Sequence, residues 1–460
     1  MYKNNPDIEG TLDEIVGHIR VRFGRGSSQL SGVRIAEAIG QMVSVGDLQP
    51  GQKLPTVRAL SARLHVSPGT VSYAWATLRT HSVIITDRRR GTTVRSTTGT
   101  IDGRYWHVPV EPGTLTHDLS TGNPDGKLLP SLTDALKKVQ LHENVTSYLD
   151  KPMLPELEEI LRSRWPFTPH QLSVVDGAQD ALDRSISSLL HLGDYAIVED
   201  PTFPPMIDMI ELSGARPLPV RSDNEGLLPD HLEKALELNP TALFLQPRSQ
   251  NPTGITMSAN RCMELAKLLA GRSITIVEDD HSGRISGTPI FSLGEYLPEQ
   301  VLHIHSFSKS HGPDLRLAAI SGPENLLGPI IKRRHLGPSW SSRLLQRILL
   351  ELLRDPTVEQ GVADTATAYA ARRSSVVASL HEVGIPVRLG TGLNIWVPVN
   401  DEQSTIVNLA AHGIGVAPGR PFMVEPSAQD FIRITLSSSI ADYGEIAKRI
   451  AMSHEKRRSN

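Results

Sequence analysis

The N-terminal part of the chain carries apolar residues at helical spacing in three successive segments. The first is "SGVRIAEAIGQMVSVGDL", and "QPGQKLP" then breaks the helix with two prolines and a glycine. The second is "PTVRALSARLHV". The third, "SPGTVSYAWATLRTH", starts with Ser67 as a good N-cap and Pro68 in the first turn. Two short β-rich runs around Asp87–Gly91 follow the helices and predict a hairpin.

Beyond residue 170 the pattern changes, because apolar runs alternate with helical segments. This alternation predicts a mostly parallel sheet covered by helices. Four runs lead into residues with useful chemistry: "YAIVEDPTF" into Phe203, "TALFLQPRSQNPTG" into Asn251, "SITIVEDDH" into Asp279 and His281, and "VLHIHSFSK" into Lys309. Ligands of open α/β sheets bind outside the carboxyl ends of the strands, so we expect one cleft to collect these side chains.

Composition limits the class of protein. A chain of 460 residues with 39% apolar residues is too long for one ordinary domain and can bury more than one core. Its single cysteine, Cys262, excludes an intramolecular disulfide and fits a reducing cytoplasm. No long apolar segment or signal peptide is present, so we expect a soluble cytoplasmic protein without a membrane partner. No metal site is predicted.

Charge is distributed unevenly along the chain. Residues 1–95 contain 13 Lys and Arg against 7 Asp and Glu, whereas the remainder contains 34 against 43. A basic head on an acidic body indicates that the head meets a polyanion. Together with three helices and a hairpin, this predicts a winged helix-turn-helix that places its last helix in the major groove of double-stranded DNA.

The stretch "DLQPGQKLPTVRALSARLHVSPGTVSYAWATL" resembles the GntR family of bacterial regulators. The resemblance implies that Arg58 contacts phosphate or base and that Thr70 starts the recognition helix. An exposed helix charge is the alternative for Arg58, and a solvated turn is the alternative for the three hairpin arginines. The residues expected to contact DNA are Arg58, Ser67, Thr70, Arg88, Arg89 and Arg90. Pro68, Gly69 and Ser72 occupy turns where family members often carry arginine, so no bidentate guanine reader is visible.

The part of the chain beyond residue 116 contains the residue types that bind one particular cofactor. A lysine that loses its proton forms a Schiff base with an aldehyde, and a carboxylate paired with a pyridinium nitrogen keeps that ring an electron sink. The small-residue turn "DGAQDAL" presents backbone amides to a phosphate at a helix start, and Arg316 can hold the same phosphate. Phe203 can stack on a flat ring, with core packing as its alternative. Together these features describe pyridoxal phosphate.

Residues 117–460 resemble the fold-type-I aminotransferases through "SFSK" with arginine seven residues on, "NPTG", "EDD" and a late "FIRIT". Joined to a GntR-type head, they are similar to the MocR subfamily of bacterial regulators. The resemblance implies that Lys309 bonds the cofactor, Asp279 pairs with its ring nitrogen, Asn251 bonds its ring hydroxyl and Arg433 binds the carboxylate of an amino-acid ligand. The implied phosphate residues are Gly177, Ala178, Gln179, Ser306, Arg316 and, from the neighbouring subunit, Tyr148.

Two positions depart from that family. Met153 stands where a glycine usually follows the tyrosine that corresponds to Tyr148. His281 stands where the family has a tyrosine that donates to the ring hydroxyl. Imidazole can also donate, but it is shorter and titrates near neutral pH. We therefore expect the cofactor to bind and transamination to be slow.

The predicted fold is α/β: a winged helix-turn-helix in residues 1–95, a linker in 96–116, and an aminotransferase-like domain in 117–460. That domain should combine a large, mostly parallel sheet with a small C-terminal α+β subdomain. The predicted function is a homodimeric, DNA-binding transcription regulator that senses pyridoxal phosphate or an amino compound. The alternatives are a working aminotransferase with a DNA-binding appendage and a scaffold that uses the body only to dimerise.

Overall fold

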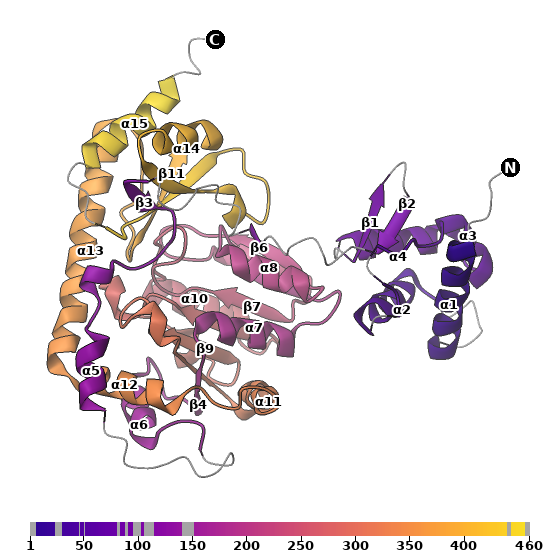
Figure 1. Cartoon of the computed structure of the whole chain (residues 1–460), viewed down its shortest axis with the longest axis horizontal. Helices are drawn as coiled ribbons and strands as arrows, with labels where there is room; N and C mark the ends of the chain where they lie inside the picture. Colours follow the sequence, from indigo (N-terminus) through magenta and orange to yellow (C-terminus); the bar gives the residue numbers. More distant parts are fainter. Residues whose placement is uncertain are drawn as a thin grey trace. The chain divides into compact units, whose positions relative to one another are not determined.

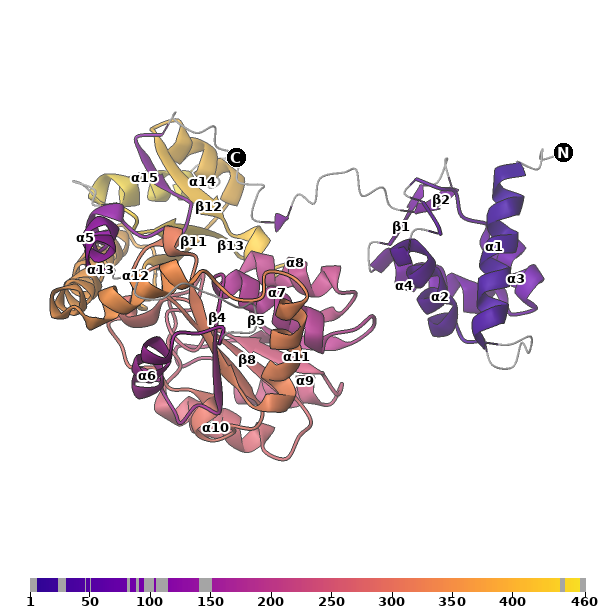
Figure 2. The same cartoon turned by 60° about the horizontal axis from the view of Figure 1, so that its bottom comes forward.

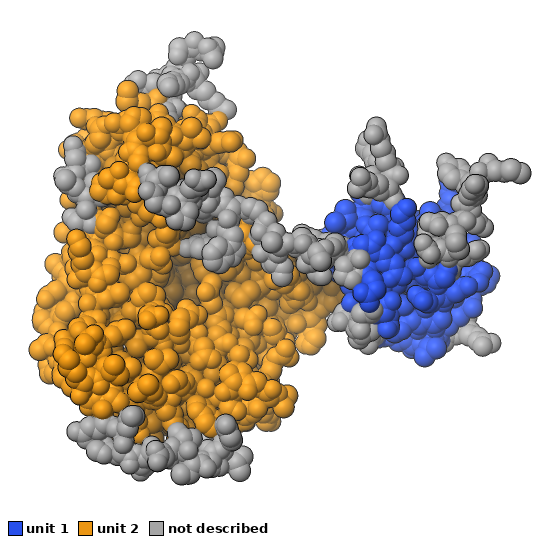
Figure 3. All heavy atoms as spheres, in the orientation of Figure 1, with its two compact units in different colours: residues 1–102 blue, residues 103–460 orange. Residues whose placement is uncertain are grey.

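The chain divides into two compact units, residues 1–102 and residues 103–460 (Figure 3). The computed structural model describes residues 6–23, 30–45, 47–49, 51–80, 83–87, 91–94, 103–104, 115–139, 151–438 and 443–455. In this part of the chain, no helix is long and apolar enough to cross a membrane, and no cluster of side chains could hold a metal ion.

Within its described residues, the first unit contains four helices and a two-stranded hairpin (Figure 1). Their bounds are Pro6–Phe23 (α1), Gly32–Val45 (α2), Val57–Leu64 (α3), Pro68–Thr80 (α4), Ile84–Asp87 (β1) and Gly91–Val94 (β2). Apolar residues of all six elements pack into one core. The three helices and the antiparallel hairpin expected from the sequence are confirmed, and the segment before them forms the further helix α1.

Local capping explains the sharp turn between α3 and α4. Thr56 caps α3 by accepting a hydrogen bond from the Ala59 amide at 3.2 Å. His65 ends the helix in the left-handed conformation with φ 56°. Ser67 Oγ then accepts the Thr70 amide at 3.1 Å, so α4 begins one residue later at Pro68. The Ser67 cap and Pro68 were predicted from the sequence because they depend only on neighbouring residues, whereas the Thr56 cap and the turn at His65 were not predicted.

The described strands of the second unit include a seven-stranded sheet of order β4-β10-β9-β8-β7-β5-β6. Only β10 runs antiparallel to its neighbours in this sheet, which confirms the expected mostly parallel arrangement. The strands are Gln171–Val175 (β4), Tyr195–Asp200 (β5), Arg216–Arg221 (β6), Ala242–Leu245 (β7), Thr275–Asp280 (β8), Val301–Ser306 (β9) and Ala318–Gly322 (β10).

Helices cover both faces of this sheet and bury a separate apolar cluster on each (Figure 2). One cluster lies under α7, α8 and α11, and the other lies under α9 and α10. The helices are Ala178–Leu189 (α7), Pro204–Leu212 (α8), Pro229–Leu236 (α9), Ala259–Leu269 (α10) and Glu324–His335 (α11). The sheet edge with the strands' carboxyl ends therefore remains free for a site.

A second, four-stranded sheet of order β11-β13-β12-β3 forms the small subdomain. Its strands are His117–Leu119 (β3), Asn394–Val399 (β11), Ile414–Pro418 (β12) and Asp430–Thr435 (β13), and its helices are Pro356–Glu382 (α13), Glu402–Ala410 (α14) and Tyr443–Glu455 (α15). This is the small α+β subdomain expected from the sequence, and it also includes β3, which pairs in parallel with β12 from the other end of the unit (Figure 1). The remaining helices are Leu132–Lys138 (α5), Pro155–Arg164 (α6) and Arg343–Arg354 (α12).

Part of the expected linker is attached to the second unit. The Arg104 amide donates to Asp208 Oδ2 at 2.8 Å, and its guanidinium forms an ion pair with Glu211 at 2.8 Å. Both acids lie on α8. The predicted boundaries at residues 95 and 117 stay a prediction, but Arg104 is bound to the body rather than a free spacer.

Candidate functional site

The four strands that precede the predicted site residues are neighbours in the large sheet. In the order β5, β7, β8, β9 each is parallel to the next, so their carboxyl ends lie along one edge. The structure thereby brings Asn251, Asp279 and Lys309 to one place, although they are far apart in the sequence. Arg433 reaches the same place from β13 of the small subdomain.

Lys309 follows β9 by three residues, and its Nζ donates a hydrogen bond to the Gly122 carbonyl. Burial and then the positive charge of Arg433 lower the pKa of Lys309, while Asp279 opposes them, and the net result is about 8. A lysine with this pKa is partly deprotonated near neutral pH. Its free amine is the form that attacks a carbonyl.

Asp279 is 2% exposed and has one oxygen bound and one unbound. Its Oδ2 accepts from Gln246 Nε2 at 2.8 Å, whereas its Oδ1 is buried without a hydrogen-bond partner in the described part of the chain. Burial raises the pKa of Asp279 to about 6, although the bond from Gln246 lowers it. Because a buried carboxylate oxygen without a partner is costly, this position favours a ligand that brings a positively charged N–H.

Gln246 is a site residue that the sequence reasoning missed. Besides holding Asp279, its Oε1 accepts from the Asn251 backbone amide at 2.8 Å. The backbone amide of Gln246 donates to Glu199 Oε2 at 2.9 Å. Gln246 directly follows β7, at the same edge as the predicted residues, so its position was a signal that motif matching overlooked.

The side chain of Asn251 has a defined orientation. Its Oδ1 accepts from Arg433 at 3.2 Å and from Asn394 Nδ2 at 3.3 Å. These bonds leave Nδ2 as a donor without a bond to any described residue. Arg433 is 1% exposed, donates also to the Ser120 carbonyl, and lies 5.0 Å over the Phe422 ring.

An anion-binding arrangement lies at the start of α7. Gly177 is the N-cap residue with φ 99°, a conformation that favours glycine, and a Cβ there would lie 3.1 Å from the Arg316 guanidinium. Arg316 itself is left-handed with φ 49° and donates to the Asp176 carbonyl at 3.2 Å. Ala178 and Gln179 form the first turn of α7, and Ser306 ends β9. Amides of a helix start beside an arginine bind phosphate well.

The structure shows how the His281 ring is bonded, and its place in the cofactor site stays a prediction. Its Nε2 lies 2.9 Å from the Ser249 carbonyl, which can only accept, so Nε2 carries the proton. Burial lowers the pKa of His281 to about 4, and the Lys309 charge lowers it too, so the ring is neutral at physiological pH. Its remaining nitrogen, Nδ1, is an acceptor 3.4 Å from Ser282 Oγ. In this structure the single N–H of His281 is therefore bonded to Ser249.

Of the other predicted residues, some are described by the structure and some are not. Phe203 is half-buried at the N-cap of α8 and packs against the apolar cluster beneath that helix, so its alternative role in the core is visible. Arg58 is exposed on α3, and the hydroxyls of Ser67 and Thr70 lie 2.8 Å apart at the start of α4. Tyr148, Arg88, Arg89 and Arg90 lie outside the described residues.

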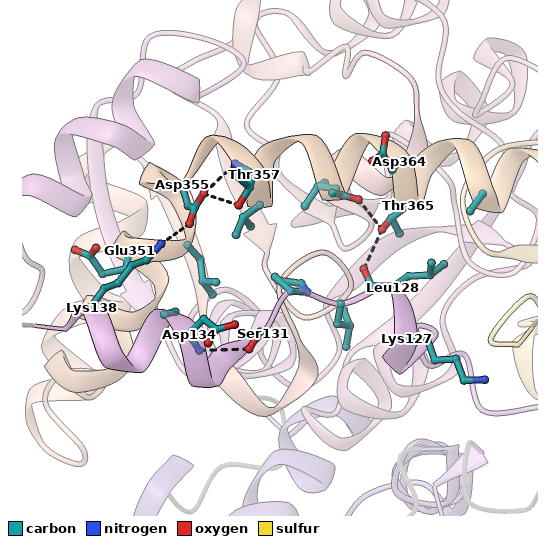
Figure 4. Close-up of a pocket in the computed structure, with 18 residues that line it drawn as sticks. Lys127, Leu128, Ser131, Asp134, Lys138, Glu351, Asp355, Thr357, Asp364 and Thr365 are labelled. Carbon is teal, nitrogen blue, oxygen red and sulfur yellow. Dashed lines mark hydrogen bonds and ion pairs between the residues drawn. The ribbon is translucent and has the colours of Figure 1, made fainter.

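A groove of about 580 Å³ lies away from these residues, between α5 and the α12–α13 junction (Figure 4). Its polar groups bind one another: Lys138 pairs with Asp355 at 2.5 Å, and Thr365 Oγ1 donates to the Leu128 carbonyl at 2.9 Å. Asp355 also caps α13 through the Thr357 amide at 2.9 Å. The groove therefore joins helices and offers few free groups to a ligand.

Comparison with known proteins agrees with this division of the chain. Residues 116–450 match the family "Aminotransferase class I and II", and residues 32–94 match "Bacterial regulatory proteins, gntR family". The chain is 33% identical over 412 residues to the vitamin B6 salvage pathway transcriptional repressor PtsJ of Salmonella typhimurium, covering 88% of this chain and 94% of that protein. It is 26% identical over 467 residues to the regulator TauR of Rhodobacter capsulatus, covering 90% and 94%.

The fold of the second unit is similar to solved aminotransferases. Kynurenine aminotransferase of Pyrococcus horikoshii matches with a TM-score of 0.67 and 22% identity, covering 75% of this chain and 91% of that one. The helix-turn-helix head and the aminotransferase fold occur in one chain, and the match to the regulator PtsJ covers both nearly end to end. The chain belongs to the MocR subfamily of GntR-type transcription regulators, which join a winged helix-turn-helix to an aminotransferase class I and II domain.

Proposed function

We propose that this protein is a DNA-binding transcription regulator whose second unit binds pyridoxal phosphate and senses it, or an amino compound, at the edge of the large sheet. The observation that carries the proposal is the pair formed by Lys309 and Asp279: a buried amine with a lowered pKa beside a buried carboxylate that has an unbound oxygen. A flat cationic ring with an aldehyde satisfies both groups at once.

The residues fit this cofactor. Asp279 Oδ1 is free to accept from the ring nitrogen, and Asn251 Nδ2 is free to donate to the ring hydroxyl. The amides at Gly177–Gln179 and the Arg316 guanidinium would hold the phosphate. When bound, pyridoxal phosphate supplies an aldehyde that condenses with amines and a ring that withdraws electrons.

Other side chains would select the ligand. Arg433, held by Asn251 and the Ser120 carbonyl, is positioned to bind the carboxylate of an amino acid. Phe203 would lie on the face of the ring. In this proposal the protein is a homodimer, because the family resemblance assigns Tyr148 to the phosphate of the neighbouring subunit.

The relative named as a repressor of vitamin B6 salvage supports the cofactor itself as the signal. Sensing a cofactor does not require rapid chemistry, and the neutral His281 agrees with this. Its single proton is bonded to Ser249, so Asn251 alone among these residues remains to donate to the ring hydroxyl. A lost hydrogen bond of about 1 kcal/mol leaves binding intact but slows a reaction several-fold. As a regulator that binds DNA, the protein would act in the bacterial cytoplasm.

One experiment separates the candidate functions. Purified full-length protein is titrated with pyridoxal phosphate and then with amino acids, while cofactor absorbance and affinity for genomic promoter DNA are followed together. We expect a change in DNA affinity that Lys309→Ala abolishes. Rapid, repeated transamination with an amino donor and a keto acid would instead support the aminotransferase. Absence of any cofactor absorbance would support the scaffold.

A further inference from the structure

A separate cavity of about 150 Å³ lies against the face of β8 and β9 that is turned away from Asp279. Consecutive residues of a strand point to opposite faces. Asp280 and His305 therefore line this cavity, whereas Asp279 and Ser306 belong to the cofactor side. It has no residue in common with the proposed cofactor site.

Part of the wall is apolar and aromatic. Trp165, Phe307 and Leu353 contribute to it, and the rings of Phe307 and His311 meet edge to face with centroids 5.7 Å apart. A cavity of this size with apolar walls can hold a benzene-sized molecule. The size and the wall select a small ligand with an apolar body.

The other part of the wall has a surplus of positive charge. Among the described residues that line the cavity, the guanidinium groups are Arg164, Arg248 and Arg284, and the carboxylates are Asp280 and Glu359. Arg248 forms two bonds of 2.6 Å to Asp280, while Arg164 and Arg284 share Glu359. Burial lowers the pKa of Arg284, and the neighbouring arginine charges lower it further. The Arg164 and Arg284 side chains are 41% and 52% exposed, so they would attract a negative charge on a ligand at the open side of the cavity.

A buried donor points to the same ligand. His311 is 8% exposed, and its Nδ1 lies 2.8 Å from Ser310 Oγ. The Phe307 carbonyl, 3.5 Å from the Ser310 hydroxyl, already accepts the His311 backbone amide at 2.8 Å, so we assign the hydroxyl proton to the closer Nδ1. The proton of the neutral His311 ring then sits on Nε2, which bonds no other described residue. Burial lowers the pKa of His311 to about 3, which keeps the ring neutral.

We propose that this cavity is a second ligand site that binds a small monocarboxylate with an apolar body. The carboxylate accepts the N–H of His311 and balances the arginine charge, and the body lies against Trp165 and Phe307. Such a ligand is distinct from the amino compound expected at Arg433.

The test uses benzoate as the probe, with the full-length protein loaded with pyridoxal phosphate and binding followed by calorimetry. Arg433→Gln first removes the carboxylate partner in the cofactor cleft. We expect one equivalent of benzoate to bind this variant still. Adding His311→Leu should then weaken that binding by at least about tenfold, since a hydrogen bond to a charged group is lost. His191→Leu, at a side chain that is 81% exposed, is the matched control and should leave binding unchanged.

Cofactor absorbance and thermal unfolding show whether each variant is folded. His311→Gln keeps an N–H donor, so it should retain part of the affinity that His311→Leu loses, and it serves if the leucine variant does not fold. Loss of all benzoate binding in Arg433→Gln would overturn the second site. Equal affinity in His311→Leu and its parent would do the same.

Discussion

The two units place their functional side chains in opposite environments. On the helix-turn-helix, Arg58 is exposed and the start of α4 is organised by bonds between near neighbours. At the sheet edge, Asp279, Asn251 and Arg433 are buried, and Arg433 bonds Asn251 across 182 residues of sequence. An exposed charge is screened by water and salt, whereas a buried group shifts its pKa and is costly to leave unpaired. Single substitutions of these site residues should therefore change binding and stability strongly in the second unit and weakly in the first.

The largest expected effect is at Lys309. Borohydride reduction of the cofactor-loaded protein should attach the label to this residue, and Lys309→Ala should lose the attachment completely while keeping its fold. Because the pKa of Lys309 is about 8, the rate at which the cofactor attaches to this lysine before reduction should rise as pH increases through that value. Peptide mass spectrometry locates the label. Lys332→Ala, an exposed control on α11, should be labelled like the wild type, and label on any lysine other than 309 would refute the assignment.

Asp279→Asn should have opposite effects on binding and on stability. We expect cofactor affinity to fall roughly a hundredfold, because a charged hydrogen bond is lost. The pKa of Asp279 is raised from 3.8 to about 6 in the folded state, so its contribution to stability is present below the unfolded value and lost as pH rises through 6. Without cofactor, the variant should exceed the wild type by up to about 3 kcal/mol near pH 8, but not near pH 4.

Urea unfolding of the cofactor-free protein at both pH values measures this difference, and cofactor titration measures the affinity. A variant that is less stable than the wild type near pH 8 would show that Asp279 is satisfied without a ligand. Unchanged affinity would remove Asp279 from the cofactor site.

Gln246→Leu tests the residue that joins Asp279 to Asn251. The change leaves Asp279 Oδ2 and the Asn251 amide without their partner, so we expect a loss of about 1–3 kcal/mol in the free energy of unfolding. Chemical denaturation measures it. Gln360→Leu is the matched control, because Gln360 makes an exposed bond to Asp364 at 2.9 Å. Equal losses in the two variants would mean that burial does not decide how much such a hydrogen bond contributes to stability.

The smallest effect is expected at Arg58. Arg58→Ala should weaken binding to all DNA sequences and reduce the slope of log affinity against log salt by about one, because one phosphate contact is lost. Arg58→Lys keeps the charge and should keep the slope. Fluorescence anisotropy at several salt concentrations measures both. A slope that does not change in Arg58→Ala would give this arginine a structural role.

Much of the site could be predicted because apolar runs in the sequence show where the strands end. The runs before Asn251, Asp279 and Lys309 are apolar, and parallel strands gather their carboxyl ends at one edge. Gln246 was missed because it belongs to no motif and acts through contacts at both ends of its amide. The hydrogen bond of His281 could not be predicted, because the direction of its N–H depends on the Ser249 carbonyl, which is distant in sequence.

The sequence by itself determined the three helices and the hairpin of the first unit, the Ser67 cap, and the alternation of strands and helices beyond residue 170, because these depend on periodicity and on neighbours a few residues away. It also determined which residue types reach the sheet edge. Only the tertiary structure decided that β3 joins the C-terminal strands, that Asp279 keeps one oxygen unbound, and that Arg433 bonds Asn251. Those outcomes follow from burial and from hydrogen-bond geometry between distant segments, and no local pattern encodes either.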